Sequence, residues 1–325
     1  MHETSGKAVT LGGWTFNKID IDDLELFSGY IAKTQYPANL WSSSFAYLWA
    51  ISQSGRRDVL WRIVDGMLAV FSHTGKGSLY LLCLPFGWGD AEKVVRVVLE
   101  CLHFCLEFNG QDSSKTMVKT VNENQLEFIK SAGSYADALR SVTWQGIERH
   151  YDVPRLCALA GKDFEKVRNR VNKFRRDHPD AVISRYRKAD FDALMLLGEH
   201  WSSTAGKKYA KVFDTVYYRE ILRHNDELGQ TTLVVRAGGR IVGMISGARL
   251  PTGDAWGSLV KFEEDIPGLS ETLIVEYARI LHRYDPGIRL LNVGSDLGSG
   301  GLRDYKMKFR PVLNLKRYQL FLKTV

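Results

Sequence analysis

A pair of β-type runs joined by a two-residue turn occurs once in each half of the chain, and this repeated pattern constrains the fold more than any other feature. The runs cover residues 59–64 and 67–73 in the first half, and residues 231–236 and 240–250 in the second. Asp65-Gly66 lies between the first two runs and Gly238-Gly239 between the second two. Both dipeptides are typical of tight hairpin turns, which need positive φ angles. The sequence therefore predicts two antiparallel hairpins.

Each predicted hairpin is followed by a third strand and then by a helix. In the first half, a strand at residues 78–84 precedes an apolar helix at residues 91–108. In the second half, a strand at residues 255–262 precedes a helix at residues 270–284, for which Ser270 is the expected cap. A further strand, a short helix and a last strand follow in each half. This order is an α+β pattern that occurs twice.

The length of 325 residues is sufficient for two domains of ordinary size. We expect a first lobe at residues 1–150 and a second lobe at residues 151–325. No short sequence repeat relates the halves, so any duplication is one of structure.

The charge balance favours an anionic partner. The formal net charge is +7 and the isoelectric point is near 9.1. Nucleic acid, phospholipid headgroups and a phosphorylated cofactor are the partner classes that such a balance indicates.

The sequence has no feature of a secreted or membrane-spanning chain, so we expect a cytoplasmic protein. Residues 1–7 have no apolar core of the kind found in signal peptides. The longest uncharged apolar run, residues 79–89, is interrupted by Pro85 and is too short to cross a bilayer. The four cysteines form no Cys-x-x-Cys pair, which suits a reducing compartment.

A glycine-rich loop near the end of the chain is the first candidate site. It follows a strand-like run at residues 288–293 and precedes a short basic segment at residues 302–309. Glycines between a strand and a helix let the backbone approach a ligand, and the exposed amides favour negative charge. Asp296 lies in this loop, with Arg303 and Lys306 one turn apart behind it. We expect a polar or anionic ligand here.

A basic helix at residues 159–178 is the second candidate site. On a helix, four apolar residues share one face: Phe164, Val167, Val171 and Phe174. Four basic residues share the opposite face: Lys162, Lys166, Arg170 and Lys173. One interpretation is an ordinary solvated helix face. From Lys162 to Arg176, however, there are seven basic residues and two acidic ones, a balance that suits contacts with a phosphate backbone.

These two segments resemble one family. The run LAGKDFEKVRNRVNKF from Leu159 and the run DLGSGGLRDYKMKFRP from Asp296 resemble the catalytic domain of lysylphosphatidylglycerol synthases, a family that also includes soluble stand-alone members. The resemblance extends to LPFGWGD at Leu84 and to the aromatic residues 36–49. It implies tandem acetyltransferase-like (GNAT) lobes, each a mixed, mostly antiparallel sheet flanked by helices.

The resemblance also implies a reaction, the transfer of an aminoacyl group from tRNA to a hydroxyl or amine of an acceptor. The membrane-bound relatives carry an integral membrane half that this sequence lacks, so both a lipid and a small-molecule acceptor stay open, as does peripheral contact with a membrane. An aminoacyl ester is already activated. We therefore expect aminoacyl-tRNA as the co-substrate and no cofactor or metal.

The resemblance implies catalytic roles for the loop residues and tRNA binding for the basic stripe. Asp296 would pair with the α-amino group or a cationic side chain, and Arg303 and Lys306 would face a phosphate or the oxyanion. The alternatives are a turn residue that bonds its own loop for Asp296, and ordinary surface charges for the two cations.

The expected substrate-binding residues are Asn292, Gly298, Gly301 and Glu264. Many relatives have an acidic residue two positions after the motif asparagine, where this chain has Gly294. Glu263 and Glu264 are the nearest replacements, and a solvated acidic loop is the alternative interpretation of that pair.

Three functions therefore stay open: an aminoacyl-tRNA-dependent transferase, an acyl-CoA-dependent N-acyltransferase, and a non-catalytic module that binds RNA or another anion. The second expects a glycine-containing pyrophosphate loop between a strand and a helix, and the sequence has no convincing copy. His150 lies near the junction of the halves, but a catalytic histidine there needs a partner that the sequence does not identify.

Overall fold

The computed structural model describes residues 7–208 and 214–323. It divides into two compact units: the first comprises Met1–Gln145 and Leu315–Val325, and the second comprises Gly146–Asn314. Residues 1–6, which contain most of the segment used to predict the absence of a signal peptide, lie outside the described residues. The expected lobe boundary at residue 150 stays a prediction.

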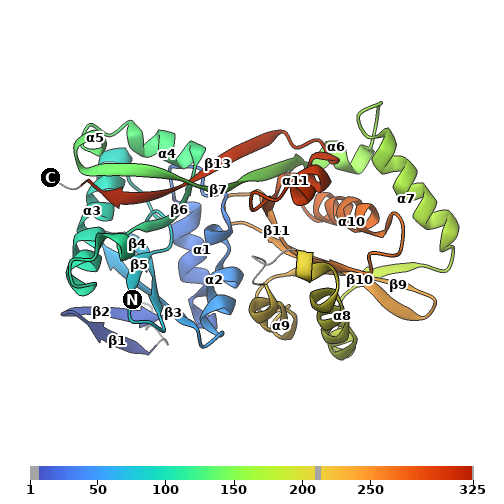
Figure 1. The fold of residues 1–325 in the computed structure, drawn as a ribbon, viewed down its shortest axis with the longest axis horizontal. Helices are drawn as coiled ribbons and strands as arrows, with labels where there is room; N and C mark the ends of the chain where they lie inside the picture. Colours follow the sequence, from blue (N-terminus) through green and yellow to red (C-terminus); the bar gives the residue numbers. More distant parts are fainter. Residues whose placement is uncertain (1–6, 209–213, 324–325) are drawn as a thin grey trace. The chain divides into compact units, whose positions relative to one another are not determined.

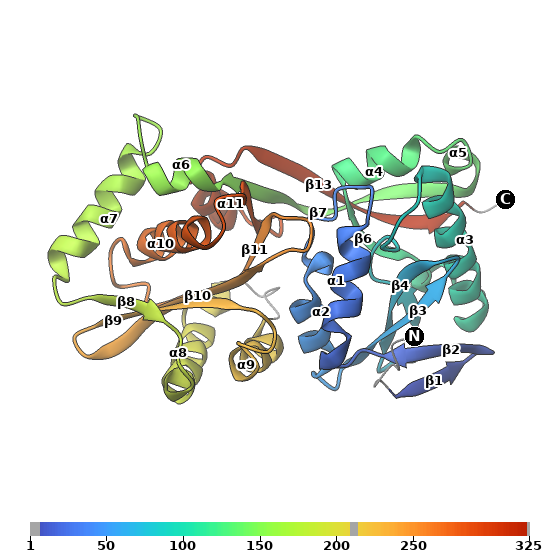
Figure 2. The same ribbon diagram turned by 180° about the vertical axis from the view of Figure 1, so that it is seen from behind.

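The first unit is a mostly antiparallel sheet with helices on both faces. Its strands run in the order β1-β2-β3-β4-β5-β6-β13-β7. They are β1 (Ala8–Leu11), β2 (Trp14–Lys18), β3 (Arg57–Val64), β4 (Met67–Thr74), β5 (Leu79–Leu81), β6 (Val118–Asn122), the first half of β7 (Leu139–Asp152) and most of β13 (Leu313–Leu322). Its helices are α1 (Leu24–Ala32), α2 (Phe45–Ser52), α3 (Ala91–Phe108), α4 (Glu123–Lys130) and α5 (Tyr135–Ala138). Helices α1 and α2 lie on one side of β3 and β4, and α3 lies on the other (Figures 1 and 2).

The hairpin expected in the first half is β3–β4. The two strands pair antiparallel from Arg57↔Thr74 to Val64↔Met67. Asp65 and Gly66 have φ angles of 46° and 74°, as a two-residue hairpin turn requires. This hairpin prediction is confirmed.

The second unit has the same kind of architecture. Its strands run in the order β7-β12-β11-β10-β9-β8. They are the second half of β7, β8 (Val182–Arg185), β9 (Thr231–Ala237), β10 (Arg240–Arg249), β11 (Ala255–Phe262) and β12 (Leu290–Ser295). Its helices are α6 (Val153–Ala158), α7 (Glu165–Asp177), α8 (Phe191–Ser203), α9 (Thr215–Arg223), α10 (Leu269–Tyr284) and α11 (Gly300–Met307). Helices α7 and α10 cover one face of β9–β11, and α8 and α9 cover the other (Figure 1).

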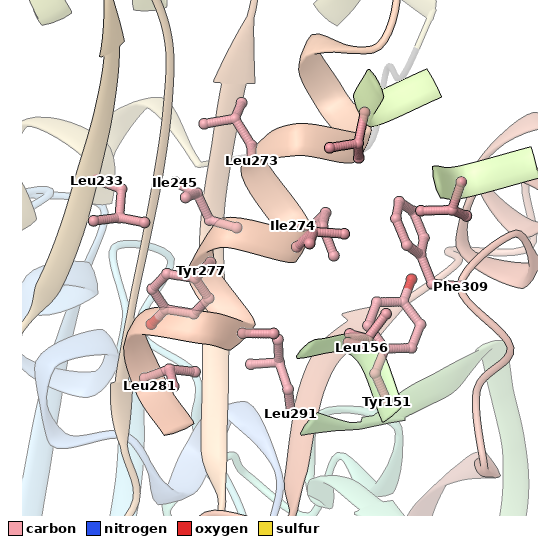
Figure 3. Packing of buried hydrophobic residues seen from close by; sticks show 14 of the residues in the cluster. Tyr151, Leu156, Leu233, Ile245, Leu273, Ile274, Tyr277, Leu281, Leu291 and Phe309 are labelled. Atoms are coloured by element: carbon pink, nitrogen blue, oxygen red, sulfur yellow. The ribbon is translucent and has the colours of Figure 1, made fainter. Parts of the chain in front are cut away.

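The core of the second unit lies between α10 and the sheet. Leu273, Tyr277 and Leu281 of α10 point toward Ile245 of β10 and Leu291 of β12 (Figure 3). All five side chains are buried. Because full burial of such a side chain stabilises the fold by about 1.5–3 kcal/mol, the packing of this helix on the sheet contributes substantially to the stability of the unit.

The start of α10 differs from the expectation. Its N-cap is Gly268 with a φ of 85°, and Ser270 lies inside the first turn. A β-carbon at Gly268 would clash with the carbonyl oxygen of Arg170 on α7. The cap residue is therefore set by the close approach of α7, which the local sequence does not reveal.

Each unit includes a strand from the other half of the sequence. From β2 and from β8 onward, both halves run strand, two helices, three strands, helix and strand, and each ends on a last strand. Two helices, α4 and α5, precede that last strand in the first half, and one helix, α11, precedes it in the second. The last strand of the first half, β7, pairs with β12 in the second unit, and the last strand of the second half, β13, pairs with β6 in the first unit. The expected α+β class with mixed, mostly antiparallel sheets flanked by helices is confirmed.

Candidate functional site

The candidate site lies in the second unit, where β11 and β12 separate. These parallel strands pair only at Ala255↔Leu291 and Trp256↔Asn292. Beyond Asn292, β12 leaves the pairing and continues into the glycine-rich loop. Parallel strands that diverge inside a sheet leave polar backbone and side-chain groups for other partners.

Asp296 ties this loop to β7. Its carboxylate accepts hydrogen bonds from the amide of Ile147 at 2.9 Å and the amide of Gly298 at 3.2 Å, and it forms an ion pair with Arg149 at 2.7 Å. The side chains of Asp296 and Arg149 are both buried. Burial raises the pKa of the Asp296 carboxyl, but the Ile147 amide, Arg149 and the Gly298 amide outweigh it, so the net pKa lies below its ordinary value. Asp296 is thus an ionised side chain that holds the loop.

Lys306 holds the other side of the same loop. Its ammonium group donates to the carbonyl oxygens of Val293, Gly294 and Ser295 at 2.6, 3.0 and 2.9 Å. Three carbonyl acceptors match the three N–H donors of a lysine. Gly294 has a φ of 71°, which favours glycine at a position where many relatives of the resembled family carry an acid.

The structure therefore brings Asp296, Gly298 and Lys306 together around one loop. Arg303 is elsewhere: it is exposed on α11 and forms an ion pair with Asp304 at 3.2 Å. Gly301 lies exposed in the first turn of α11, where an added β-carbon would have open space around it. The catalytic and binding roles expected for these residues stay predictions.

A buried polar cluster on β7 and β12 was not identified from the sequence. Asn292 lies opposite His150 in the antiparallel pairing, and its amide donates to the carboxylate of Glu148 at 3.2 Å. Because Glu148 and His150 are two residues apart on one strand, all three side chains share a face of the sheet. We call Glu148, His150 and Asn292 the polar cluster. Each is at most 1% exposed.

His150 is the unusual member of the polar cluster. Neither ring nitrogen has a hydrogen-bond partner among the described residues. Burial lowers the pKa of His150 to about 4, so the ring is neutral at physiological pH. A buried polar group without a partner costs about 1–3 kcal/mol, and such a cost is common at functional sites.

Two aromatic side chains lie next to the polar cluster. Trp256 is the register partner of Asn292 on β11. Tyr217 of α9 lies 6.4 Å from Trp256 between ring centroids. This arrangement was not predictable from local sequence, because it joins residues of β11, α9 and β12 that are far apart in the chain.

Glu264 lies in the connection from β11 to α10, where it is exposed. The neighbouring Glu263 forms an ion pair with Arg240. With Asp265, these residues give the connection three carboxylates immediately before α10. A coenzyme A pyrophosphate at this helix start would meet negative charge, and α7 packs against Gly268 at the same point.

The basic helix is α7, and its predicted apolar face is confirmed. Val167, Val171 and Phe174 are each at most 2% exposed. On the opposite face, Lys166 and Arg170 are exposed and form no ion pair with the described residues.

The remaining two residues of the predicted stripe differ from that pair. Lys162 precedes the helix and is exposed, and Lys173 forms an ion pair with Asp177 at 2.5 Å. Lys166 and Arg170, which are one turn apart, are the members of the stripe on α7 that form no ion pair within the described ranges.

The protein is thus a two-unit α+β chain. Its second unit has a buried polar cluster next to the point where the parallel strands β11 and β12 separate. Residues 37–321 match the family model described as phosphatidylglycerol lysyltransferase, C-terminal. The chain belongs to this family, and it is therefore a transferase.

Several solved structures have the same fold. A conserved protein of unknown function from Bacteroides thetaiotaomicron is 21% identical, with a TM-score of 0.79, and the match covers 95% of this chain and 99% of that one. L-PGS from Bacillus licheniformis is 17% identical, with a TM-score of 0.64 and coverage of 95% and 93%. The C-terminal domain of a putative lysylphosphatidylglycerol synthetase from Agrobacterium fabrum is 17% identical, with a TM-score of 0.61 and coverage of 93% and 92%. No curated protein matches the chain. Among the described residues, no helix has the length and apolar character needed to cross a membrane.

Proposed function

We propose that this protein moves an amino acid from aminoacyl-tRNA to a hydroxyl or amine of a lipid or small-molecule acceptor. The observation that supports this most directly is the family match over residues 37–321, because the family is named for lysyl transfer to phosphatidylglycerol. The ester bond of aminoacyl-tRNA is already activated for acyl transfer, so the reaction as proposed uses no cofactor.

The polar cluster supplies groups that suit this reaction. The acceptor oxygen or nitrogen attacks the ester carbonyl carbon, the bond to the tRNA ribose oxygen breaks, and the acceptor's proton passes to that ribose oxygen. A neutral His150 is able to accept a hydrogen bond from the acceptor as its proton is lost. The carboxylate of Glu148 suits the ammonium group of the aminoacyl moiety. Asp296 and Lys306 hold the adjoining loop in place.

Helix α7 has an exposed face that is suited to binding the phosphate backbone of the tRNA. Its exposed face carries Lys166 and Arg170 without carboxylate partners among the described residues, and such cations contact phosphates without reading sequence. The helix is fixed by its buried apolar face, so the two cations have a defined position.

The alternative of an acyl-CoA-dependent transferase is less well supported. The acyl-CoA alternative expects a pyrophosphate loop between a strand and a helix, but the connection between β11 and α10 is acidic, and α7 packs against Gly268 at its end. The non-catalytic alternative differs from the proposal only in turnover, so the experiment must separate binding from transfer.

Substitution of His150 by leucine separates tRNA binding from aminoacyl transfer. Leucine is of similar size and has no polar atoms to leave unpaired, so we expect the free energy of unfolding to stay equal or to rise slightly. Transfer from labelled aminoacyl-tRNA should fall by about 100-fold or more, with tRNA affinity unchanged. His103→Leu, at an exposed position of α3, is the matched control. Unchanged transfer by the His150 variant would contradict the role of the polar cluster.

A further inference from the structure

The sheet of the first unit carries a group of cationic and aromatic side chains that the proposed function does not use. Lys119 is on β6, Arg57 on β3, Arg317 on β13, Tyr80 on β5 and Trp144 on β7. Five strands far apart in the sequence thus contribute one side chain each.

Direct contacts join these side chains. The ammonium of Lys119 lies 4.6 Å from the centroid of the Trp144 ring and 5.9 Å from that of Tyr80. The guanidinium of Arg57 donates to the hydroxyl of Tyr80 at 3.3 Å. Arg317 donates to the backbone carbonyl of Gln145, next to Trp144. Lys119 and Arg57 therefore contact the two aromatic residues, and Arg317 contacts the strand next to Trp144.

Two of the cations, Arg57 and Lys119, lack a carboxylate partner within the described part of the chain. Partial burial, followed by the nearby charges of Arg57 and Arg317, lowers the pKa of Lys119. Like charges held together in this way repel one another, and a bound anion would relieve the repulsion.

An apolar surface adjoins the cations. Trp144 is 37% exposed and Val142 is 40% exposed. They are two residues apart on β7, so they share the face that Lys119 contacts. A ring or an apolar group of a ligand would find contact area here, with the cations beside it.

We propose that Arg57, Lys119 and Trp144 form a binding site for a small organic phosphate. The phosphate group lies against the two cations, since an arginine guanidinium matches phosphate oxygens in geometry and charge. The ring or apolar part of the ligand lies on Trp144 and Val142. This site is within the first unit, and its existence does not depend on the proposed aminoacyl transfer.

Calorimetric titration of the full chain at low salt tests this site with three probes: adenosine 5′-monophosphate, glycerol 3-phosphate and inorganic phosphate. We expect saturable binding of all three, tightest for the nucleotide. Lys119→Gln and Arg57→Gln should each weaken binding by about tenfold, the usual effect of losing a charged hydrogen bond. Trp144→Ala should weaken only the nucleotide.

Lys130→Gln is the matched control, because Lys130 is exposed on α4 of the same unit and has no ion pair among the described residues. An equal loss with Lys130→Gln, or no saturable binding of any probe, would overturn the site. Equal affinity for the nucleotide and inorganic phosphate, unchanged by Trp144→Ala, would overturn the proposed contact between the ligand and the surface formed by Trp144 and Val142. Circular dichroism and thermal melting of each variant identify a folding defect. The Lys119 side chain donates no hydrogen bond to the described residues, so Lys119→Gln keeps the test decisive if Arg57→Gln fails to fold.

Discussion

At the scale of single residues, Asp296 has a partner that the sequence did not identify. The sequence singled it out as a loop carboxylate beside two cations. In the structure it is ionised and buried, and its partner is Arg149 of β7. The nearby Lys306 is occupied by three carbonyl oxygens. Both residues hold the loop beside the site, and the catalytic roles expected for them stay predictions.

Asp296→Asn should destabilise the fold strongly. The substitution leaves the buried guanidinium of Arg149 without its counter-charge, and breaking a buried ion pair in this way costs about 3–5 kcal/mol. Urea denaturation measures the loss in free energy of unfolding. Asp304→Asn, at an exposed position of α11, is the matched control and should change that free energy by less than about 0.5 kcal/mol. A similarly small loss for Asp296→Asn would show that the pair is not buried as described.

The contribution of Asp296 should depend on pH. Because the folded-state pKa of this carboxyl is lowered, its stabilisation is fully present above the ordinary pKa of about 4 and is lost as the pH falls through the folded-state value. The stability difference between the wild type and Asp296→Asn should therefore be largest near neutral pH and shrink in acid. Denaturation curves at several pH values measure it. A difference that grew in acid would contradict the lowered pKa.

At the scale of elements, the regular helices and hairpins were predictable and the polar cluster was not. The apolar face of α7 follows from residues spaced three and four apart, and the β3–β4 hairpin follows from its Asp-Gly turn. The register of β7 on β12, which brings His150 opposite Asn292, depends on long-range pairing. Nothing local to either strand specifies it, so His150 had no visible partner in the sequence.

Reversing the charge of Lys166 and Arg170 together should weaken tRNA binding. If both contact phosphates, Lys166→Glu with Arg170→Glu should lower affinity and reduce the dependence of log affinity on log salt by about two units. Filter binding over a range of salt concentrations measures this slope. Lys188→Glu with Arg283→Glu, two exposed positions of the same unit, gives the same change in net charge. If both pairs of substitutions weakened binding equally, the effect would come from the net charge of the protein and not from a tRNA contact on α7.

At the scale of the whole molecule, the two halves of the sequence do not coincide with the two compact units. The first unit needs β13 from the end of the chain, and β13 pairs with β6. A repeated order of elements suggests two independent lobes. It does not show where the last strand of each half will pair, because that choice depends on tertiary contacts.

A fragment of residues 1–150 should therefore fail to fold cooperatively. It lacks β13, so β6 would keep an unpaired edge and the apolar side chain of Leu320, which is fully buried in the intact chain, would be missing from the core. Circular dichroism and urea denaturation of the fragment, with and without a peptide of residues 313–325, measure this. A sharp unfolding transition for the fragment alone would contradict the need for β13.

The central claim is the transfer reaction, and one measurement tests it most directly. Purified protein is mixed with bulk tRNA charged with labelled amino acids and with lipid and small-metabolite extracts as acceptors. The proposal predicts that label moves from tRNA into an organic or low-mass fraction, and that His150→Leu abolishes the movement while tRNA is still bound. Label that stays on tRNA in the presence of every acceptor would contradict it.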